Sequence, residues 1–222
     1  MFTLILTPLL LTLKVAILAT VGALLVGIIL AWLMTRYSFV GRDLVDVVLT
    51  LPLVMPPTVL GYYLLIMVGR KGPIGAWLQE SFGISLIFSW QGAVLAAMVA
   101  SLPLVFKSAR TAFASVEQNC EDAARTLGAS ELAVFCRISL PLAWRGLLAG
   151  SMLAFARAMG EFGATLMVAG NMPGRTQTLS MAVYDAVQAG DDGLAHTLVL
   201  ITSLVSAMIL YGSGKLLQKE YS

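Results

Sequence analysis

The chain of 222 residues is 59% hydrophobic and only 12% charged, and its mean hydropathy is +0.88. An ordinary soluble domain carries roughly twice that share of charged residues. The apolar residues gather in long runs between short charged stretches, which is typical of a polytopic membrane protein. The net charge of +2 is too small to indicate a nucleic-acid partner. We therefore predict an all-α protein that forms one transmembrane domain over residues 1–222.

Cysteine and histidine are too few for a metal or redox site. Cys120 and Cys136 match neither a zinc-binding pattern nor a CxxC motif, and the sequence has one histidine. We interpret both thiols as small packing residues. No P-loop pattern occurs either, so we expect no cofactor, metal ligand or catalytic residue on this chain.

Five apolar runs are long enough to cross about 30 Å of hydrocarbon as helices. We place these spans near residues 12–34, 46–68, 86–106, 142–168 and 194–213. Residues 1–11 are apolar as well, and the sequence leaves open whether they form an extra membrane segment or lie along the interface.

Lysine and arginine are divided unevenly between the two sides of the membrane that these spans define. One side would carry nine of the 14 basic residues: Arg36, Arg42, Lys107, Arg110, Arg125, Arg137, Arg145, Lys215 and Lys219. The other would carry four, namely Lys14, Arg70, Lys71 and Arg175. Because cytoplasmic loops are enriched in basic residues, we predict an external N-terminus, a cytoplasmic C-terminus and a cytoplasmic loop over 107–141.

The second span is interrupted by proline. Pro56 and Pro57 lie in the stretch LPLVMPPTVLG, and Thr58 and Gly61 follow directly. Proline leaves backbone carbonyls without a donor, which hydrocarbon tolerates only where protein or a cavity satisfies them. The pattern indicates either a packing kink or a bent helix that lines a translocation pathway or gate, with Thr58 offering a hydroxyl.

The fourth span carries two opposite charges, Arg157 and Glu161, within apolar sequence. Their spacing of four residues would place them on one helix face, where they can pair. An unpaired charge at that depth costs at least ~2.5–3.5 kcal/mol, so we predict an ion pair. Its role is either structural, tying helices together, or part of the gate.

The stretch between the fourth and fifth spans contains a turn at Pro173 and a short amphipathic helix over 177–189. It lies outside in the predicted topology. Its exposed residues, Pro173, Arg175 and Asp191 among them, would form either a docking surface for a binding protein or an ordinary solvated loop.

The segment EDAARTLGASELAVFCRISLP, residues 121–141, predicts a helix–turn–helix on the cytoplasmic face. An acidic residue begins the first helix, where the helix dipole favours negative charge. Gly128 ends that helix, and Ser130 is well placed to cap the next one. Pro141 lies near the start of the fourth span, where its missing donor costs little. Small residues on the first helix suit insertion into a groove on a partner protein.

The spacing of Asp122-Ala-Ala, Gly128, Ile138 and Leu140-Pro141 resembles the EAA loop of binding-protein-dependent ABC importer permeases. The resemblance covers about residues 8–215 and places the coupling element at about 118–130. It assigns seven residues to the loop that couples the permease to an ATPase: Glu121, Asp122, Ala123, Ala124, Gly128, Ala129 and Pro141. The first position holds Asp122 instead of the usual glutamate, and Glu121 precedes it, so either carboxylate could make the expected contact.

The stretches LPLVMPPTVLGYYLL and ARAMGEFGATLMVAGNMPGRTQTL resemble the molybdate permease branch of that family in particular. A permease for tungstate or for sulfate and thiosulfate is the alternative. The resemblance implies the type I ABC importer permease fold, a homodimer, and an alternating-access pathway in the bacterial inner membrane. It also implies two separate ATPase subunits, which bind ATP and Mg, and a periplasmic molybdate-binding protein.

Two other classes fit the sequence less well. A secondary transporter would need an inverted repeat, and the spans show no matching halves. A membrane-embedded enzyme would need clustered catalytic side chains at membrane depth, where only Arg157 and Glu161 occur. Because the spans offer few hydrogen-bond donors for a tetrahedral dianion, we expect selectivity to lie in the periplasmic partner.

Overall fold

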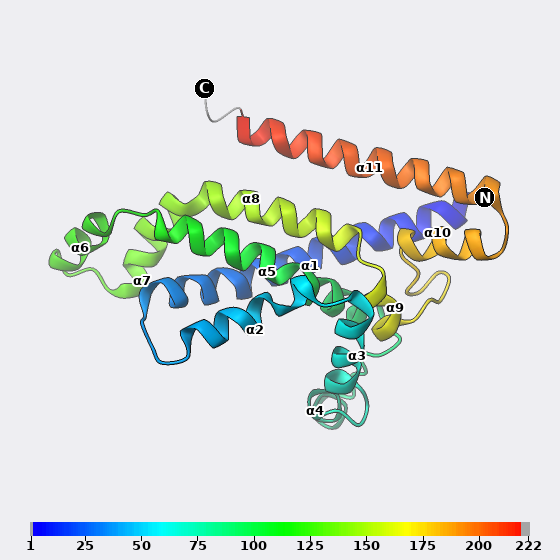
Figure 1. The fold of residues 1–222 in the computed structure, drawn as a ribbon, viewed down its shortest axis with the longest axis horizontal. Coiled ribbons are helices and arrows are strands. Elements are labelled where there is room, and N and C mark those ends of the chain that lie inside the picture. Colours follow the sequence, from blue (N-terminus) through cyan, green and yellow to red (C-terminus); the bar gives the residue numbers. More distant parts are fainter. Residues whose placement is uncertain (1, 219–222) are drawn as a thin grey trace.

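The protein forms an elongated helical bundle in a computed structural model, which describes residues 2–218 (Figure 1). Four long apolar helices have the length to span a membrane: α1 (Phe2–Arg36), α5 (Trp90–Ala114), α8 (Leu140–Met159) and α11 (Asp192–Gln218). Shorter helices connect them: α2 (Arg42–Val54), α3 (Pro57–Val68), α4 (Pro73–Phe82), α6 (Gln118–Thr126), α7 (Glu131–Val134), α9 (Gly163–Ala169) and α10 (Leu179–Gln188). The described residues contain no strand, as the all-α prediction requires.

The core of the bundle is formed by α1, α5 and α8, which approach one another through small side chains. Fully buried alanines on α1 face fully buried alanines on α5, and Ala158 of α8 completes the same cluster. In a membrane the lipid chains are as apolar as a leucine side chain, so close van der Waals packing of small residues stabilises helix contacts. This core is the rigid frame on which the other segments are placed.

The first predicted span is longer than expected, because residues 2–11 continue α1 and do not form a separate segment. The Thr12 hydroxyl donates to the carbonyl of Pro8 (2.8 Å) and accepts from the Leu179 amide (2.8 Å). The beginning of α1 is thereby held against α10.

The second predicted span is two helices, α2 and α3, whose axes are bent by 119° at Met55–Pro56. Pro56 precedes the first turn of α3, and Pro57 begins it, a position where a missing amide donor costs little. The kink that the prolines predicted is therefore a full break, and α3 leaves the bundle sideways (Figure 1). Residues 2–218 provide up to five spans, if this bent pair crosses the membrane as one.

Two predicted boundaries are wrong. The loop placed at 107–141 is helical at its start, because α5 continues to Ala114. The span placed at 142–168 is interrupted: α8 ends at Met159, and α9 begins at Gly163 after a short non-helical stretch. Hydropathy alone could not show this break, since residues on both sides of it are apolar.

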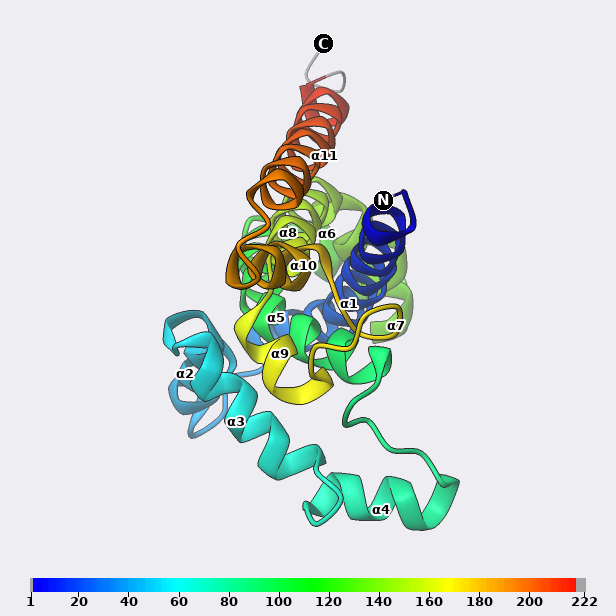
Figure 2. The ribbon, with the colours of Figure 1, turned by 90° about the vertical axis from the view of Figure 1, so that its right-hand side faces the viewer.

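The two ends of the bundle carry different segments. The coupling end is formed by α6, α7 and the last turn of α1, whereas α10 lies at the opposite end, which faces the viewer in Figure 2. Cys120 of α6 and Cys136 are both exposed. The interpretation of these thiols as packing residues within the chain is therefore wrong.

The contact between α3 and α9 depends on Gly61. A Cβ atom at this position would lie 2.9 Å from the Cα of Ala164 and 2.7 Å from the Cβ of Met167. We expect Gly61→Ala to destabilise the protein by about 1–3 kcal/mol, because the helices would have to separate. The measurement is the thermal unfolding midpoint of the purified protein in detergent. Gly212→Ala is the matched control, since a Cβ there meets nothing within 4 Å and alanine favours a helix; equal midpoints for both variants would contradict the prediction.

Candidate functional site

The coupling segment, residues 117–141, has the helix–turn–helix form that the sequence predicted. Gly128 follows α6 with φ +85°, a left-handed conformation that glycine adopts without steric cost. The amide of Ala129 donates to the carbonyl of Ala124 (3.0 Å), which closes the end of α6. The Ser130 side chain then caps α7 by accepting from the Ala133 amide (3.3 Å).

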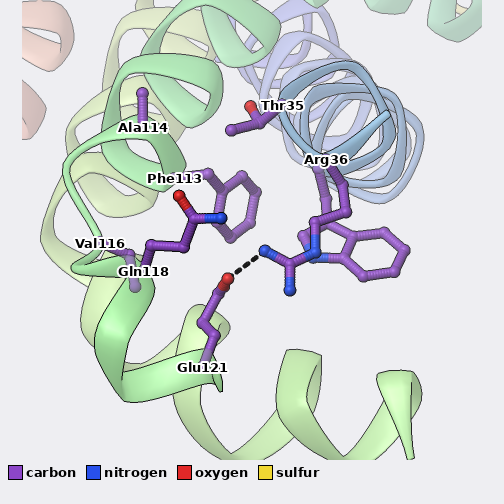
Figure 3. A pocket seen from close by; sticks show the side chains of 8 residues that line it. Thr35, Arg36, Phe113, Ala114, Val116, Gln118 and Glu121 are labelled. Atoms are coloured by element: carbon purple, nitrogen blue, oxygen red, sulfur yellow. Dashed lines mark hydrogen bonds and ion pairs between the residues drawn. The ribbon is translucent and has the colours of Figure 1, made fainter. Parts of the chain in front are cut away.

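The two adjacent carboxylates of this segment have opposite environments. Glu121 is buried, forms an ion pair with Arg36, and accepts a hydrogen bond from the Ser139 hydroxyl (2.6 Å). Figure 3 shows Arg36, at the end of α1, reaching across to Glu121 on α6. Asp122 is 56% exposed and pairs with Arg125 on its own helix. Glu121 therefore holds the coupling segment to the bundle, and Asp122 is available at its surface.

Arg125 joins the two short helices of the segment. Its Nε lies 2.7 Å from Glu131 Oε1, and its guanidinium also lies 3.6 Å from Glu121. Arg36 approaches Glu131 as well, at 3.7 Å. Two arginines and three acidic residues thus form one network, which fixes α6 relative to both α7 and α1.

Residues 131–159 form one continuous helix that contains a π-helical turn, Phe135–Ser139, between α7 and α8. Leu140 donates its amide to the carbonyl of Phe135, five residues back. Such a widened turn suits the position directly before Pro141, which lacks an amide donor and would crowd the preceding turn. Ser139, which donates to Glu121, belongs to this turn.

An aromatic cluster lies beneath the network. Phe135 packs against Trp32 of α1 and Phe113 of α5, with ring centroids 5.0 and 6.1 Å apart. Beside it is a cavity of about 170 Å³, and Arg36 and Glu121 are among the residues that line it (Figure 3). The cluster fixes the position of the charged network against the ends of α1 and α5.

A second charged cluster at the same end was not predicted. Asp46 of α2 pairs with Lys107 (2.6 Å) and Arg110, which lie one turn apart on α5. Its carboxylate is the acceptor for both cations and ties α2 to α5. The sequence signal for this cluster was an acidic residue inside an apolar run. It did not identify the partners, because they lie more than 60 residues away along the chain.

The predicted gate residues meet around a cavity of about 270 Å³. Pro57 and Thr58 of α3 line it, together with Arg157 of α8 and Glu161, which follows that helix. Gly61 lies one turn further along α3, against α9, and Pro56 is exposed before α3. The structure therefore brings the proline break and the charged pair together, although about 100 residues separate them in sequence.

Glu161 forms the predicted ion pair with Arg157, at 2.6 Å. It does so from outside the helix, because α8 has already ended at Met159. Its other oxygen accepts from the Ala164 amide (2.8 Å), which satisfies an unpaired donor at the start of α9. The Glu161 side chain is 1% exposed and that of Arg157 is 30% exposed. One buried carboxylate thus stabilises the break between α8 and α9.

The predicted docking residues lie at the surface of the opposite end. Pro173 and Arg175 are exposed in the loop before α10, and Asp191 is exposed before α11, where it accepts from the Leu194 amide (3.0 Å). Asp185 of α10 anchors this loop by accepting from Asn171 and Gln177, each at 2.6 Å. The predicted amphipathic helix is α10.

Residues 23–220 match the family model described as "Binding-protein-dependent transport system inner membrane component". The chain is 49% identical over 202 residues to the molybdenum transport system permease protein ModB of Escherichia coli K12, covering 90% of this chain and 87% of the relative. It is 43% identical to the ModB protein of Haemophilus influenzae, covering 95% and 93%. It is 32% identical to the sulfate transport system permease protein CysT of Escherichia coli K12, covering 92% and 74%.

Solved ABC importers have the same fold. A chain of the MetNI methionine transporter in an inward-facing conformation superposes with a TM-score of 0.72 at 15% identity, covering 97% of this chain and 95% of that one. A chain of a bacterial alginate importer, in complex with its ligand-bound periplasmic protein, gives a TM-score of 0.74 at 14% identity, covering 94% and 76%. With the family match over most of its length, the chain belongs to the inner-membrane permease components of binding-protein-dependent ABC importers.

Proposed function

We propose that the chain is the permease subunit of an ATP-driven molybdate importer. The observation that supports molybdate as the substrate is the sequence identity, which is 49% to a molybdenum permease and 32% to a sulfate permease. Tungstate is the alternative cargo, because it is a tetrahedral dianion like molybdate. In this proposal the chain translocates and does not catalyse, and ATP and Mg bind to partner subunits.

The coupling segment is the surface that we assign to the ATPase. Asp122 is exposed there, and so are the apolar side chains of Leu127 (88% exposed) and Leu132 (71%). Exposed leucines beside a charged helix are typical of a surface that a partner covers. We assign the contact to Asp122 and the internal link to Glu121, so that movement of α6 is passed to α1 through Arg36.

The pathway requires two copies in this proposal. A two-fold dimer repeats one surface by symmetry and can enclose a central pathway. The gate would be the cavity between α3 and the α8–α9 break, with Arg157 and Glu161 beside it. ATP-driven closure of the ATPases would move both coupling segments and switch the gate from inward-facing to outward-facing.

The orientation follows from the charges. Arg36, Lys107, Arg110 and Arg125 all lie at the coupling end, which we therefore place in the cytoplasm. The N-terminus and α10 would then be periplasmic and the C-terminus cytoplasmic. Lys219 lies outside the described residues. The loop at Pro173 and Arg175, with Asp191, is the proposed docking surface for a periplasmic molybdate-binding protein.

The substrate is tested in proteoliposomes that contain the permease, its ATPase and its binding protein. We expect uptake of radiolabelled molybdate that requires ATP, is inhibited by equimolar tungstate, and persists in a large excess of sulfate. Uptake driven by an ion gradient without ATP would instead support a secondary transporter. Equal inhibition by sulfate would make the chain a general oxyanion permease.

Two neighbouring substitutions test the assignment of the carboxylates. Asp122→Ala should lower ATP-driven uptake about tenfold, corresponding to ~1.4 kcal/mol, without changing the thermal unfolding midpoint. Glu121→Gln should destabilise the purified permease by about 1–3 kcal/mol, because Arg36 loses its buried partner.

The ATPase contact itself can be measured at Cys120, which is exposed on α6. In a Cys136→Ser background, bound ATPase should slow maleimide labelling of Cys120, and Asp122→Ala should weaken that protection. The assignment is reversed if Glu121→Gln abolishes protection at an unchanged unfolding midpoint while Asp122→Ala has no effect.

The ion pair beside the gate can be tested with glutamine, which keeps an acceptor for the Ala164 amide. Of the two single changes, Arg157→Gln should destabilise the protein more, because it leaves the buried Glu161 carboxylate unpaired. We expect the free energy of unfolding to fall by an amount at the lower end of about 3–5 kcal/mol. The double variant Arg157→Gln/Glu161→Gln should unfold at a higher temperature than Arg157→Gln alone. Additive losses in unfolding midpoint and in uptake would show that the two residues act separately.

A further inference from the structure

A cavity at the opposite end from the coupling segment gathers three of the four basic residues that the sequence analysis placed outside. Arg70 and Lys71 follow α3, Arg175 lies in the loop before α10, and Ser85 and Ser89 precede α5. The outer basic cavity, as we call it, has a volume of about 690 Å³. In Figure 2, α4 and the chain that leads from it into α5 lie below α9, from which the chain continues towards α10.

The charge of this cavity is uncompensated. Its lining contains no acidic side chain, and within residues 2–218 none of its three cations forms an ion pair. Four basic side chains at the coupling end, by contrast, are paired with carboxylates: Arg36, Lys107, Arg110 and Arg125. A cleft lined by one sign of charge concentrates ions of the opposite sign. Two guanidinium groups and an ammonium group are also the donors that best suit an oxyanion.

The cavity is joined to the helix that borders the gate. Phe88, in its wall, is the one non-glycine residue with positive φ (+54°) among the described residues. Its amide donates to the carbonyl of Val168 in α9 (3.1 Å). A Cβ atom added at Gly170 would lie 2.8 Å from the Phe88 ring, so the ring packs directly against this glycine. A bulky residue held in this conformation stores backbone strain, which surrounding contacts must maintain. The wall of the cavity is thereby fixed to the end of α9.

We propose that the outer basic cavity is a low-affinity receiving site for a tetrahedral oxyanion, occupied between its release from the binding protein and its entry into the pathway. The inference rests on the proposed function, since it takes the transported dianion as the ligand. Exposed cations in water bind a dianion weakly and in a salt-dependent way. Weak binding suits this role, because a tight site would retain the cargo.

The test uses the permease in phosphatidylcholine nanodiscs, without binding protein, and measures molybdate binding by its nuclear magnetic resonance line width at low salt. We expect binding in the millimolar range that tungstate displaces. The triple variant Arg70→Gln/Lys71→Gln/Arg175→Gln should weaken it at least about tenfold, and raising the salt should do the same. Lys14→Gln is the control, because Lys14 is an outer cation that lies over Trp90 and does not line the cavity.

A second control keeps the charge within the cavity. The double variant Arg70→Lys/Arg175→Lys should retain most of the molybdate binding. That result would show that the loss in the triple variant comes from the removed charge and not from a folding defect. In the complete reconstituted transporter, the triple variant should lower uptake at limiting molybdate more than at saturating molybdate.

Three results would overturn the proposal. The first is unchanged molybdate binding in the triple variant. The second is that the wild type binds no molybdate but retains phosphatidylglycerol through these cations, which would make the cavity a lipid headgroup site. The third is that the triple variant weakens only the association with the binding protein, which would limit the three cations to the docking surface already proposed at Arg175. Failure of the proposed function is distinguishable, because transport of sulfate in place of molybdate would leave dianion binding in the cavity intact.

Discussion

The buried ion pair between Arg36 and Glu121 is the contact on which the arrangement of the coupling end depends. A carboxylate removed from water is costly unless both a charge and hydrogen bonds compensate for it. The compensating positive charge for Glu121 is Arg36 at the end of α1, and its hydrogen bond comes from Ser139, in the π-helical turn before α8. Three elements must therefore keep their relative positions for one side chain to remain satisfied.

This constraint determines how movement can pass through the protein. Because α6 is bound to α1 and to the helix that continues into α8, it cannot shift alone without breaking the pair. α1 and α8 in turn share the alanine-lined core with α5, where small side chains leave little free volume. The break between α2 and α3 lies outside this core, and the break between α8 and α9 begins at its edge, directly after the core residue Met159. In the proposed function, a displacement of the coupling segment would be transmitted as a rigid-body movement and absorbed at those two breaks.

The sequence predicted the features that depend on local chemistry. Gly128 and Ser130 marked a helix end and a helix start because left-handed φ and side-chain capping are properties of single residues. Pro56 and Pro57 marked the break in the second span for the same reason. The break after α8 was missed, because it depends on Glu161 capturing the amide of Ala164 and not on a helix-breaking proline.

Features that depend on tertiary contacts were beyond the sequence. Adjacent residues on a helix are rotated by about 100° from each other. Asp122 and Glu121 therefore had to face different surroundings, but only the position of Arg36 shows which one is buried. The pairing of Asp46 with Lys107 and Arg110 likewise required knowledge that α2 packs on α5. Charges close together in sequence could be paired by spacing, as Arg157 and Glu161 were, whereas distant ones could not.

The same distribution of charge explains how a permease can pass a dianion without holding it. At the proposed gate the cation Arg157 is paired with Glu161, and Thr58 is a polar side chain of α3 that borders the cavity. A dianion there meets little net charge, so it has no deep energy minimum in the pathway. Three uncompensated cations line the cavity at the outer end, where water screens them and binding stays weak. Attraction is therefore greatest where the cargo must be collected and small where it must move, which leaves discrimination between oxyanions to a partner that encloses its ligand.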